Sequence, residues 1–414
     1  MALLVSLSES GSTEEKNMNS PVAKESAARL TSLDVYRGLT MLFMASEIIR
    51  IPEVTATFTD SRFWQFVTDQ LSHKQWVGCS AWDLIQPSFT FMVGVALPFS
   101  YASRKAKGQS FGKMLLHVIY RSLALTFLGV FLRSDSRTQT YFTFEDVLSQ
   151  IGLGYTFLFL LCRVRPKTQL IAALLILVGY WAAFALYPAP GPGFDYQSVG
   201  VPPDWPHHQT GFAAHWDKNT NFAAAFDQWF LNLFPREKPF VFNGGGYLTL
   251  SFIPSLATMI FGLLSGGLLR SQRPGIRKVQ ILLVCGLLGL VLGALLHALG
   301  ICPIVKRIWT PSWTIFSTGW TCLFLAAFYW VIDLKGYKRW AFPALVVGMN
   351  SITMYCLVHL MDRFIAHSLK IHLGQRVFEV FGQTYEPILQ GTAVLLTLWL
   401  ICFWMYKRKI FLRI

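Results

Sequence analysis

The chain has 414 residues, of which 53% are hydrophobic and only 14% are charged. An average soluble domain has roughly 25% charged residues, so the composition excludes an ordinary soluble globular protein and indicates a membrane protein. The net charge of +14 favours loops held near anionic lipid over contacts with nucleic acid, because the basic residues gather in short segments between apolar runs.

Apolar segments long enough to cross a bilayer occupy most of the chain. A spanning helix needs roughly 20 mostly apolar residues, and about ten such segments are visible. We expect them at approximately 33–50, 84–103, 114–133, 144–162, 168–187, 247–269, 279–299, 312–332, 341–361 and 386–406. They predict an all-α, polytopic transmembrane domain at 31–414. The polar residues 1–30 predict a disordered cytoplasmic tail without a cleavable signal peptide.

Short loops rich in Lys and Arg alternate with loops that hold few bases for their length. The basic loops are 104–113, 163–167, 270–278, 333–339 and 407–413. The positive-inside rule places these loops and both termini in the cytoplasm. We expect the membrane to be the cell (inner) membrane. The loops 51–83 and 188–246 would then face the outside.

Ionisable residues interrupt the first apolar segment, "RLTSLDVYRGLTMLFMASE". Asp34 and Arg37 stand at i and i+3 and are therefore neighbours on one helix face near the cytoplasmic end. They form either a local ion pair that anchors the helix at the headgroups or a site for an anionic ligand, since arginine binds phosphate through a planar fork. Glu47 lies about 15 Å further along the helix, toward the outer half of the membrane.

The loop before the second span carries a histidine and an acid in "LSHKQWVGCSAWDLIQPSFTF". In isolation His73 would more often be a packed or solvated loop residue than a catalyst. The tryptophan-rich loop and the helix predicted to begin at Asp83 would hold the ring at the membrane surface. A neutral imidazole there can take a proton from an amine or hydroxyl, or can itself attack a thioester. With Glu47 at the same level, these residues predict a polar pocket.

Polar residues also interrupt the late apolar run "FPALVVGMNSITMYCLVHL". Such residues often do no more than join neighbouring helices. On an uninterrupted helix Asn350 and His359 are about two and a half turns apart and lie on opposite faces. His359 is therefore expected to close the outer end of a pocket that other spans build.

The long outer loop contains three histidines, His207, His208 and His215, in "PPDWPHHQTGFAAHWDKNTNF". Their spacing matches no zinc pattern, and the seven cysteines show no CxxC pair, so we expect no metal site. A sugar-facing or solvated aromatic loop is the better interpretation. The glycines of "NGGGY" at 243–247 lack a following GK[ST], which argues against a phosphate loop.

Three stretches resemble a known family. They are "RLTSLDVYRGLTMLFM", "SHKQWVGCSAWDLIQPSFTFMVG", and "CPIVKRIWTPSW" followed by "DLKGYKRWAFPALVVGMNSITMY". The pattern is similar to that of the transmembrane acyltransferases that include heparan-alpha-glucosaminide N-acetyltransferase and bacterial relatives. The resemblance implies acetyl transfer from cytoplasmic acetyl-CoA to an amino sugar across the membrane, with His73 in the place of the proposed catalytic histidine. Glu47, Val305 and "NGGGY" depart from the family pattern, which bears on the choice of acceptor.

The expected protein is a membrane-embedded acetyltransferase that binds acetyl-CoA and a sugar or glycan acceptor. His73 acts as base or acyl carrier, and Glu47 or Asp83 orients it. The donor site is assigned to Asp34, Arg37 and Asn350, and the acceptor site to Trp76 and His359. Direct transfer, transfer through acetyl-His73 and assembly as a homodimer stay open. The alternative function is a sugar or amino-glycan transporter, although the internal repeats of many transporters are not apparent.

Overall fold

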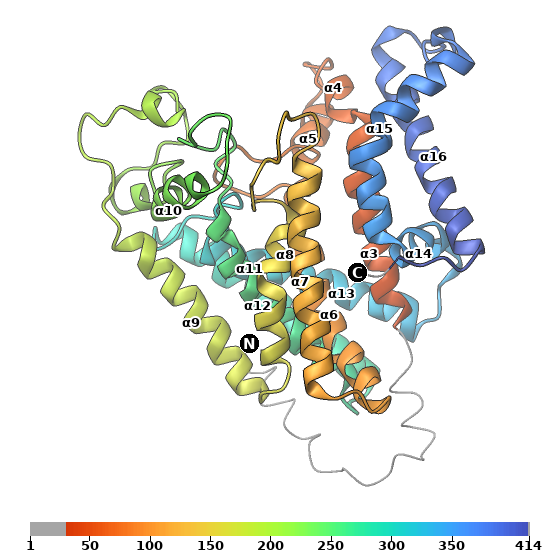
Figure 1. The fold of residues 1–414 in the computed structure, drawn as a ribbon, viewed down its shortest axis with the longest axis horizontal. Coiled ribbons are helices and arrows are strands. Elements are labelled where there is room, and N and C mark those ends of the chain that lie inside the picture. Colours follow the sequence, from red (N-terminus) through yellow and green to blue (C-terminus); the bar gives the residue numbers. More distant parts are fainter. Residues whose placement is uncertain (1–29, 413–414) are drawn as a thin grey trace. The chain divides into compact units, whose positions relative to one another are not determined.

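The computed structural model describes residues 30–412, so the predicted tail at 1–30 lies outside the described residues except for Leu30. The described part is helical and contains no strand, which confirms the predicted all-α fold (Figure 1). The chain divides into two compact units. The larger unit comprises Gln75–Gly78 and Gln86–Trp330, and the smaller unit comprises Leu30–Lys74, Cys79–Ile85 and residues 331–412.

The larger unit is a bundle of long apolar helices with one short helix in the loop 188–246. Its helices are α6 (Ile85–Ala106), α7 (Phe111–Arg133), α8 (Val147–Leu161), α9 (Pro166–Ala185), α10 (Phe222–Phe230), α11 (Phe252–Arg270), α12 (Gly275–Ala298) and α13 (Pro311–Phe328). Helix α11 is central, because it packs against α8, α9 and α13. The most apolar window of its span is 83% buried, against 28% for α9. The peripheral helices therefore expose apolar faces suited to lipid.

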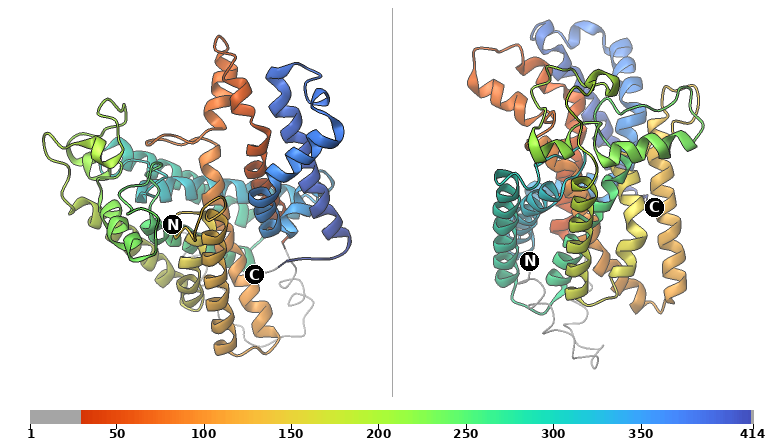
Figure 2. Two further views of the ribbon diagram at one scale, coloured as in Figure 1. Left: turned by 45° about the horizontal axis from the view of Figure 1, so that its top comes forward. Right: turned by 90° about the vertical axis from the view of Figure 1, so that its left-hand side faces the viewer.

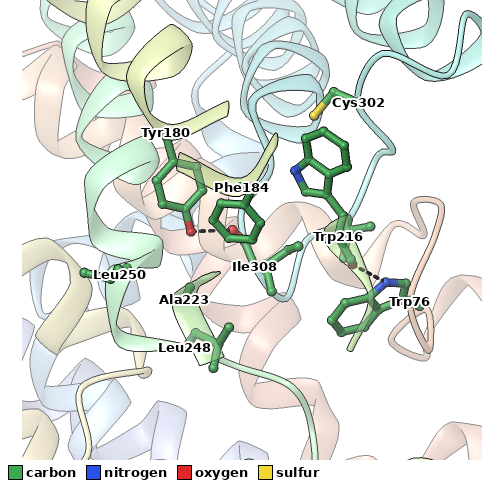
Figure 3. Packing of buried hydrophobic residues seen from close by; sticks show 10 residues of the cluster. Trp76, Tyr180, Phe184, Trp216, Ala223, Leu248, Leu250, Cys302 and Ile308 are labelled. Carbon is green, nitrogen blue, oxygen red and sulfur yellow. Dashed lines mark hydrogen bonds between the residues drawn. The ribbon is translucent and has the colours of Figure 1, made fainter. Parts of the chain in front are cut away.

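The predicted outer loop 188–246 folds around a buried aromatic cluster in the larger unit. The Nε1 group of Trp76 donates to the carbonyl of Trp216 at 3.1 Å, and the hydroxyl of Tyr180 donates to the carbonyl of Ile308 at 3.0 Å (Figure 3). Phe184 stacks against Trp216, with ring centroids 6.4 Å apart. The contacts of Trp216 hold the loop on α9 and on the segment that carries Trp76.

The smaller unit packs the first described helix against α14 and α15. Its helices are α3 (Thr31–Ala45), α4 (Ile51–Thr55), α5 (Arg62–Gln70), α14 (Phe342–Met349), α15 (Ser351–Leu373) and α16 (Glu386–Lys407). The blue helices α15 and α16 run side by side in Figure 2, and α3 packs on α14 and α15. The Asp333 carboxylate accepts hydrogen bonds from the Ser32 backbone N–H, at 3.4 Å, and from the Ser32 hydroxyl. It therefore satisfies a donor in the first turn of α3, where Leu30 supplies no side-chain cap.

Helices α3 and α14 touch backbone to backbone. A Cβ added to Gly38 would lie 1.7 Å from the Ala344 carbonyl oxygen, and one added to Gly348 would lie 1.9 Å from the backbone carbonyl oxygen of Asp34. Only glycine permits this approach, as at many helix contacts in membranes. The contact holds the helix turn that carries Asp34 and Arg37.

The predicted span 341–361 is wrong as one continuous helix. The chain breaks at Asn350 between α14 and α15, which are bent by 71° relative to each other. The Asn350 amide nitrogen donates to the Ile410 carbonyl at 3.1 Å, and its oxygen accepts from the Leu412 N–H at 3.2 Å. The C-terminal segment thus supplies hydrogen bonds at the break. Helix α15 then continues to Leu373, beyond the predicted end.

The number of spans is close to the expected ten. Seven described helices are long and apolar enough to cross a membrane, or eight if α14 and α15 form one span. The two other predicted spans correspond to α3 and α8, each with 15 residues. Helix α3 continues into the 3-10 segment Ser46–Ile49. A helix of 15 residues is about 22 Å long, which is less than the roughly 30 Å of a hydrocarbon core.

Candidate active site

The predicted histidine and aspartate lie together in the smaller unit. Nδ1 of His73 is 2.8 Å from Oδ1 of Asp83. The Asp83 side chain is 1% exposed, whereas the His73 side chain is 39% exposed. The pair therefore combines a buried carboxylate with an imidazole that a substrate can reach. This spatial pairing is what a histidine base and its orienting acid require.

Local hydrogen bonds explain why the loop brings the two residues together. Oδ2 of Asp83 accepts from the backbone N–H groups of Lys74 and Ser80, both at 3.2 Å, and lies 3.0 Å from the Ser80 hydroxyl. The Asp83 N–H in turn donates to the Ser80 hydroxyl at 3.3 Å. Ser80 and Asp83 thus form the reciprocal bonds of a capping box. They precede the 3-10 turn Trp82–Leu84, which leads into α6.

Two further contacts fix the segment on which His73 lies. The Ser80 hydroxyl is 2.7 Å from the Ser72 carbonyl oxygen, and the Ala81 N–H donates to the Gln70 side-chain oxygen at 3.1 Å. These residues were not among those assigned to the site from sequence. The Ser-x-x-Asp spacing before an apolar run is the signal that would have identified Ser80.

An aromatic column supports the imidazole within the smaller unit. The edge of the His73 ring faces Trp82 at a centroid distance of 6.4 Å, and Trp82 packs edge to face on Phe43 of α3 at 5.0 Å. Trp82 is 8% exposed. The ring is therefore held in a partly apolar setting in which water is restricted and electrostatic interactions are strengthened.

The hydrogen bond to Asp83 determines what His73 can do chemically. Because a carboxylate only accepts, Nδ1 of a neutral His73 carries the hydrogen and Nε2 carries the lone pair. Nε2 is then the atom that can take a proton or attack an electrophile. The Asp83 charge stabilises the imidazolium that forms.

Glu47 and Trp76 differ in their surroundings. Glu47 lies on the 3-10 segment Ser46–Ile49 with an exposed side chain. Trp76 belongs to the larger unit and is 1% exposed within the aromatic cluster. Its indole therefore anchors the loop that follows His73, and its assignment to the acceptor stays a prediction.

The residues assigned to the donor site differ in how accessible they are. Nη1 of Arg37 is 3.6 Å from Oδ1 of Asp34, so the two form the ion pair that their spacing predicts. The Asp34 side chain is 7% exposed and that of Arg37 is 25% exposed, which leaves the guanidinium as the accessible group. Asn350 is fully buried and bonded to residues 410–412. A role in donor binding requires that segment to move.

The histidines outside the loop of His73 make separate contacts. Nδ1 of His359 is 2.9 Å from the Tyr355 carbonyl oxygen one turn earlier, and its ring stacks on Tyr355. In the outer loop, His208 bonds the Pro202 carbonyl and His215 bonds the Tyr187 carbonyl. Within residues 30–412, no group of three or more His, Cys, Asp or Glu side chains is arranged to hold a metal ion.

Two acids of the loop 188–246 have raised pKa values because they are buried. Burial raises the pKa of Asp227 to about 6, although the N–H of Thr249, which donates to it at 2.9 Å, acts in the opposite direction. Burial also raises the pKa of Asp217 to about 6 against the effect of the Gln209 N–H. Both acids therefore remain protonated in the folded loop at a pH at which a solvated aspartate is ionised.

The fold and the His73–Asp83 pair define a polytopic helical membrane protein with a carboxylate-oriented imidazole at the start of an apolar helix. The family model described as heparan-alpha-glucosaminide N-acetyltransferase, catalytic, matches residues 29–191. The chain is similar to the heparan-alpha-glucosaminide N-acetyltransferases of Mus musculus, with 24% identity over 94% of the chain, and Homo sapiens, with 23% identity over 93%. These matches confirm the resemblance inferred from the motifs. The chain spans about three fifths of the two relatives, 61% and 60% of their lengths.

Proposed function

We propose that the protein is a membrane-embedded acetyltransferase. It would move the acetyl group of cytoplasmic acetyl-CoA onto an amino sugar or glycan on the extracytoplasmic side of the inner membrane. The observation that carries this proposal is the half-exposed His73 imidazole, whose Nδ1 lies 2.8 Å from the buried Asp83 carboxylate. The similarity to two N-acetyltransferases supports the choice of acetyl transfer over other reactions of a histidine base.

In the direct route, His73 acts as the general base. The acceptor amine attacks the thioester carbonyl of acetyl-CoA while Nε2 of His73 takes the proton that the amine loses. The C–S bond then breaks, and the imidazolium returns the proton to the coenzyme A thiolate. Asp83 holds the ring and stabilises its cation throughout. The products are an acetamido sugar and coenzyme A.

In the alternative route, His73 attacks the thioester first. The acetyl group passes to Nε2 with release of coenzyme A, and the acceptor amine then removes it. Exchange of label between coenzyme A and acetyl-CoA in the absence of acceptor occurs only by this route. That measurement separates the two routes without requiring the identity of the acceptor.

The remaining roles are proposed for the residues that were assigned from the sequence. Arg37 would bind a phosphate of the donor, with Asp34 keeping its guanidinium in place at 3.6 Å. Asn350 would join them only after displacement of the C-terminal segment. Glu47 would be the second carboxylate of the site, His359 would lie at its outer end, and Trp76 would act by anchoring the loop.

The break at Asn350 bears on the alternative function as a transporter, because broken helices often form transport sites. In such sites the freed backbone groups bind substrate or ions. Here both ends of the Asn350 amide bind Ile410 and Leu412 of the same chain. The break is therefore filled by protein, and it does not favour transport.

The decisive experiment supplies purified protein with labelled acetyl-CoA and a panel of amino sugars. Acetyl transfer and stoichiometric release of coenzyme A are expected for wild type. General-base catalysis contributes about 10²–10⁴-fold, so His73→Gln should lower turnover by that order. His297→Gln, which changes an exposed histidine of α12, is the matched control. Sugar uptake into vesicles without release of coenzyme A would overturn the proposal in favour of transport.

A further inference from the structure

One end of the helices in the larger unit carries many basic residues and no acidic ones. This base-rich end is formed by the loops that join α6 to α7, α8 to α9 and α11 to α12, namely 104–113, 163–167 and 270–278. No Asp or Glu occurs in the stretches that contain every helix of the unit except α10, namely 84–134, 147–194 and 238–332. These helices therefore supply no carboxylate to the cations of the base-rich end.

One of these cations, Arg121, lies inside α7 and not in a loop. It stands ten positions after Phe111, the first residue of the helix, which is about 15 Å along the helix axis. Helix α7 is long and apolar enough to cross a membrane. An ionisable residue within such a span is costly, and it indicates a functional site by default. The charge of Arg121 therefore requires an explanation.

Tyr155 of α8 holds the Arg121 guanidinium but supplies no negative charge. Helices α7 and α8 pack side by side (Figure 1). Nη1 of Arg121 donates to the Tyr155 hydroxyl at 3.2 Å, and the guanidinium carbon is 4.8 Å from the centroid of the Tyr155 ring. Nε of Arg121 is buried and has no hydrogen-bond partner within residues 30–412. The guanidinium is thus fixed in place while donor capacity and charge are left over.

Two further side chains that can donate to an anion lie near Arg121. His117 stands one turn earlier on the same helix, and Arg104 is in the last turn of α6. Arg104 and Arg121 both act on the His117 ring through their charge. All three side chains are partly exposed. Because side chains on a helix lean toward its N-terminus, Arg121 extends toward His117 and the base-rich end. We call these three residues the Arg104–His117–Arg121 cluster.

The cluster lies beside a helix face that is suited to lipid. Apolar and aromatic side chains at i, i+4, i+7 and i+11 of α7 are all exposed and form one stripe: Leu116, Tyr120, Leu123 and Phe127. His117 and Arg121 directly follow two members of this stripe in the chain, so they lie about 100° around the helix from it. A molecule whose apolar chains cover the stripe would bring its polar end to the edge where the cluster lies.

We propose that the Arg104–His117–Arg121 cluster binds the phosphate of an anionic phospholipid. The phosphate oxygens would accept from the two guanidinium groups, and the acyl chains would cover the exposed stripe of α7. A zwitterionic phospholipid brings a cation of its own, for which the surrounding helices supply no carboxylate. A soluble phosphate compound has no chains for the stripe. The chemistry of the site therefore favours a lipid with net negative charge.

This site is more specific than the general attraction of basic loops to anionic lipid, because Arg121 lies within a span. The assignment does not rest on acetyl transfer, since it concerns lipid binding within the larger unit alone. It can therefore fail or succeed independently of the proposed reaction.

The test measures lipid binding to the purified full-length protein by native mass spectrometry. The probes are dioleoyl phosphatidylglycerol, which is anionic, and dioleoyl phosphatidylcholine, which has the same chains and no net charge. The anionic probe should bind about tenfold more tightly, because only its charge is left unbalanced at the site. Coenzyme A and inorganic phosphate, added separately to the lipid-loaded protein, should not displace it.

Variants assign the binding to the cluster. Arg104→Gln and Arg121→Gln, tested separately, should each weaken phosphatidylglycerol binding about tenfold. Arg277→Gln makes the same change at an exposed arginine in the first turn of α12, also at the base-rich end, and should not change it. Thermal unfolding without lipid checks that the variants fold, and Arg104→Gln decides if Arg121→Gln does not.

Four results would each overturn the proposal. They are equal binding of the two lipids, unchanged binding in the folded variants, an equal loss of binding in Arg277→Gln, and displacement of the lipid by coenzyme A or inorganic phosphate. The last result would assign the cluster to a soluble phosphate compound.

Discussion

Replacing Asp83 with asparagine tests whether this carboxylate sets the protonated nitrogen of His73. The side chain keeps its shape but gains an N–H₂ group in place of one acceptor. In the native protein, Oδ2 accepts from two backbone N–H groups, those of Lys74 and Ser80, while Oδ1 faces His73. If the amide nitrogen faced these two N–H groups, both would lose their acceptor, at a cost of about 1–3 kcal/mol for each unpaired N–H. The amide oxygen should therefore replace Oδ2.

That orientation has a direct chemical consequence. The amide N–H₂ would face Nδ1 of His73 across 2.8 Å and donate to it. Nδ1 must then accept, so the hydrogen moves to Nε2 and the lone pair is lost from the atom that faces the substrate. In the Ser-His-Asp triad the same exchange lowers kcat roughly 10⁴-fold. We expect a fall of about 10²–10⁴-fold in kcat here, with little change in donor affinity.

The assay is transfer of labelled acetyl from acetyl-CoA, with kcat and KM determined separately and donor binding measured by calorimetry. Asp69→Asn is the matched control. It makes the same chemical change at a carboxylate that is 49% exposed and bonds the side chains of Lys74 and Gln70. A folded Asp83→Asn variant with kcat within about tenfold of wild type would refute the assignment of Asp83 as the orienting acid.

Three further predictions concern donor binding, helix packing and pH. Arg37→Ala should weaken acetyl-CoA binding by about 1.5–3 kcal/mol, as measured by calorimetry. Unchanged affinity would indicate that the Asp34–Arg37 ion pair only anchors the helix at the headgroups. Gly348→Ala should destabilise the fold by about 1–3 kcal/mol or more in thermal unfolding, because its Cβ would lie 1.9 Å from the backbone carbonyl oxygen of Asp34. Gly179→Ala should leave the stability unchanged, because a Cβ there meets nothing within 4 Å. Because burial raises the pKa of Asp227 from 3.8 to about 6, its contribution to stability is complete below about pH 4 and is lost as the pH rises through 6. Asp227→Asn should flatten this part of the unfolding profile, and identical profiles would contradict the assigned pKa.

The spans could be predicted from sequence because each depends on local hydropathy. The break at Asn350 could not, since position 350 is neither proline nor glycine and polar residues within an apolar segment often only join neighbouring helices. The break is stabilised by hydrogen bonds to Ile410 and Leu412, which lie 60 and 62 positions further along the chain. Local sequence gives no indication of such partners.

The candidate site likewise has a part that could be predicted from local sequence and a part that could not. His73 and Asp83 are ten positions apart and belong to one loop, so their pairing could be expected from the motif. Trp76 is adjacent in sequence, but its environment is set by Trp216, which is 140 positions away. A tryptophan in a polar loop is equally compatible with a substrate contact and with a buried anchor. Only the long-range contact distinguishes the two.

One carboxylate serves two purposes in this loop. Asp83 accepts the N–H of Ser80 in a capping box and also accepts from the His73 ring. The capping bonds keep the carboxylate buried at 1% exposure, where its charge acts on the imidazole with little screening by water. They also cap the 3-10 turn Trp82–Leu84, which is followed in the chain by α6. The position of the imidazole therefore follows from the way the segment before α6 is capped.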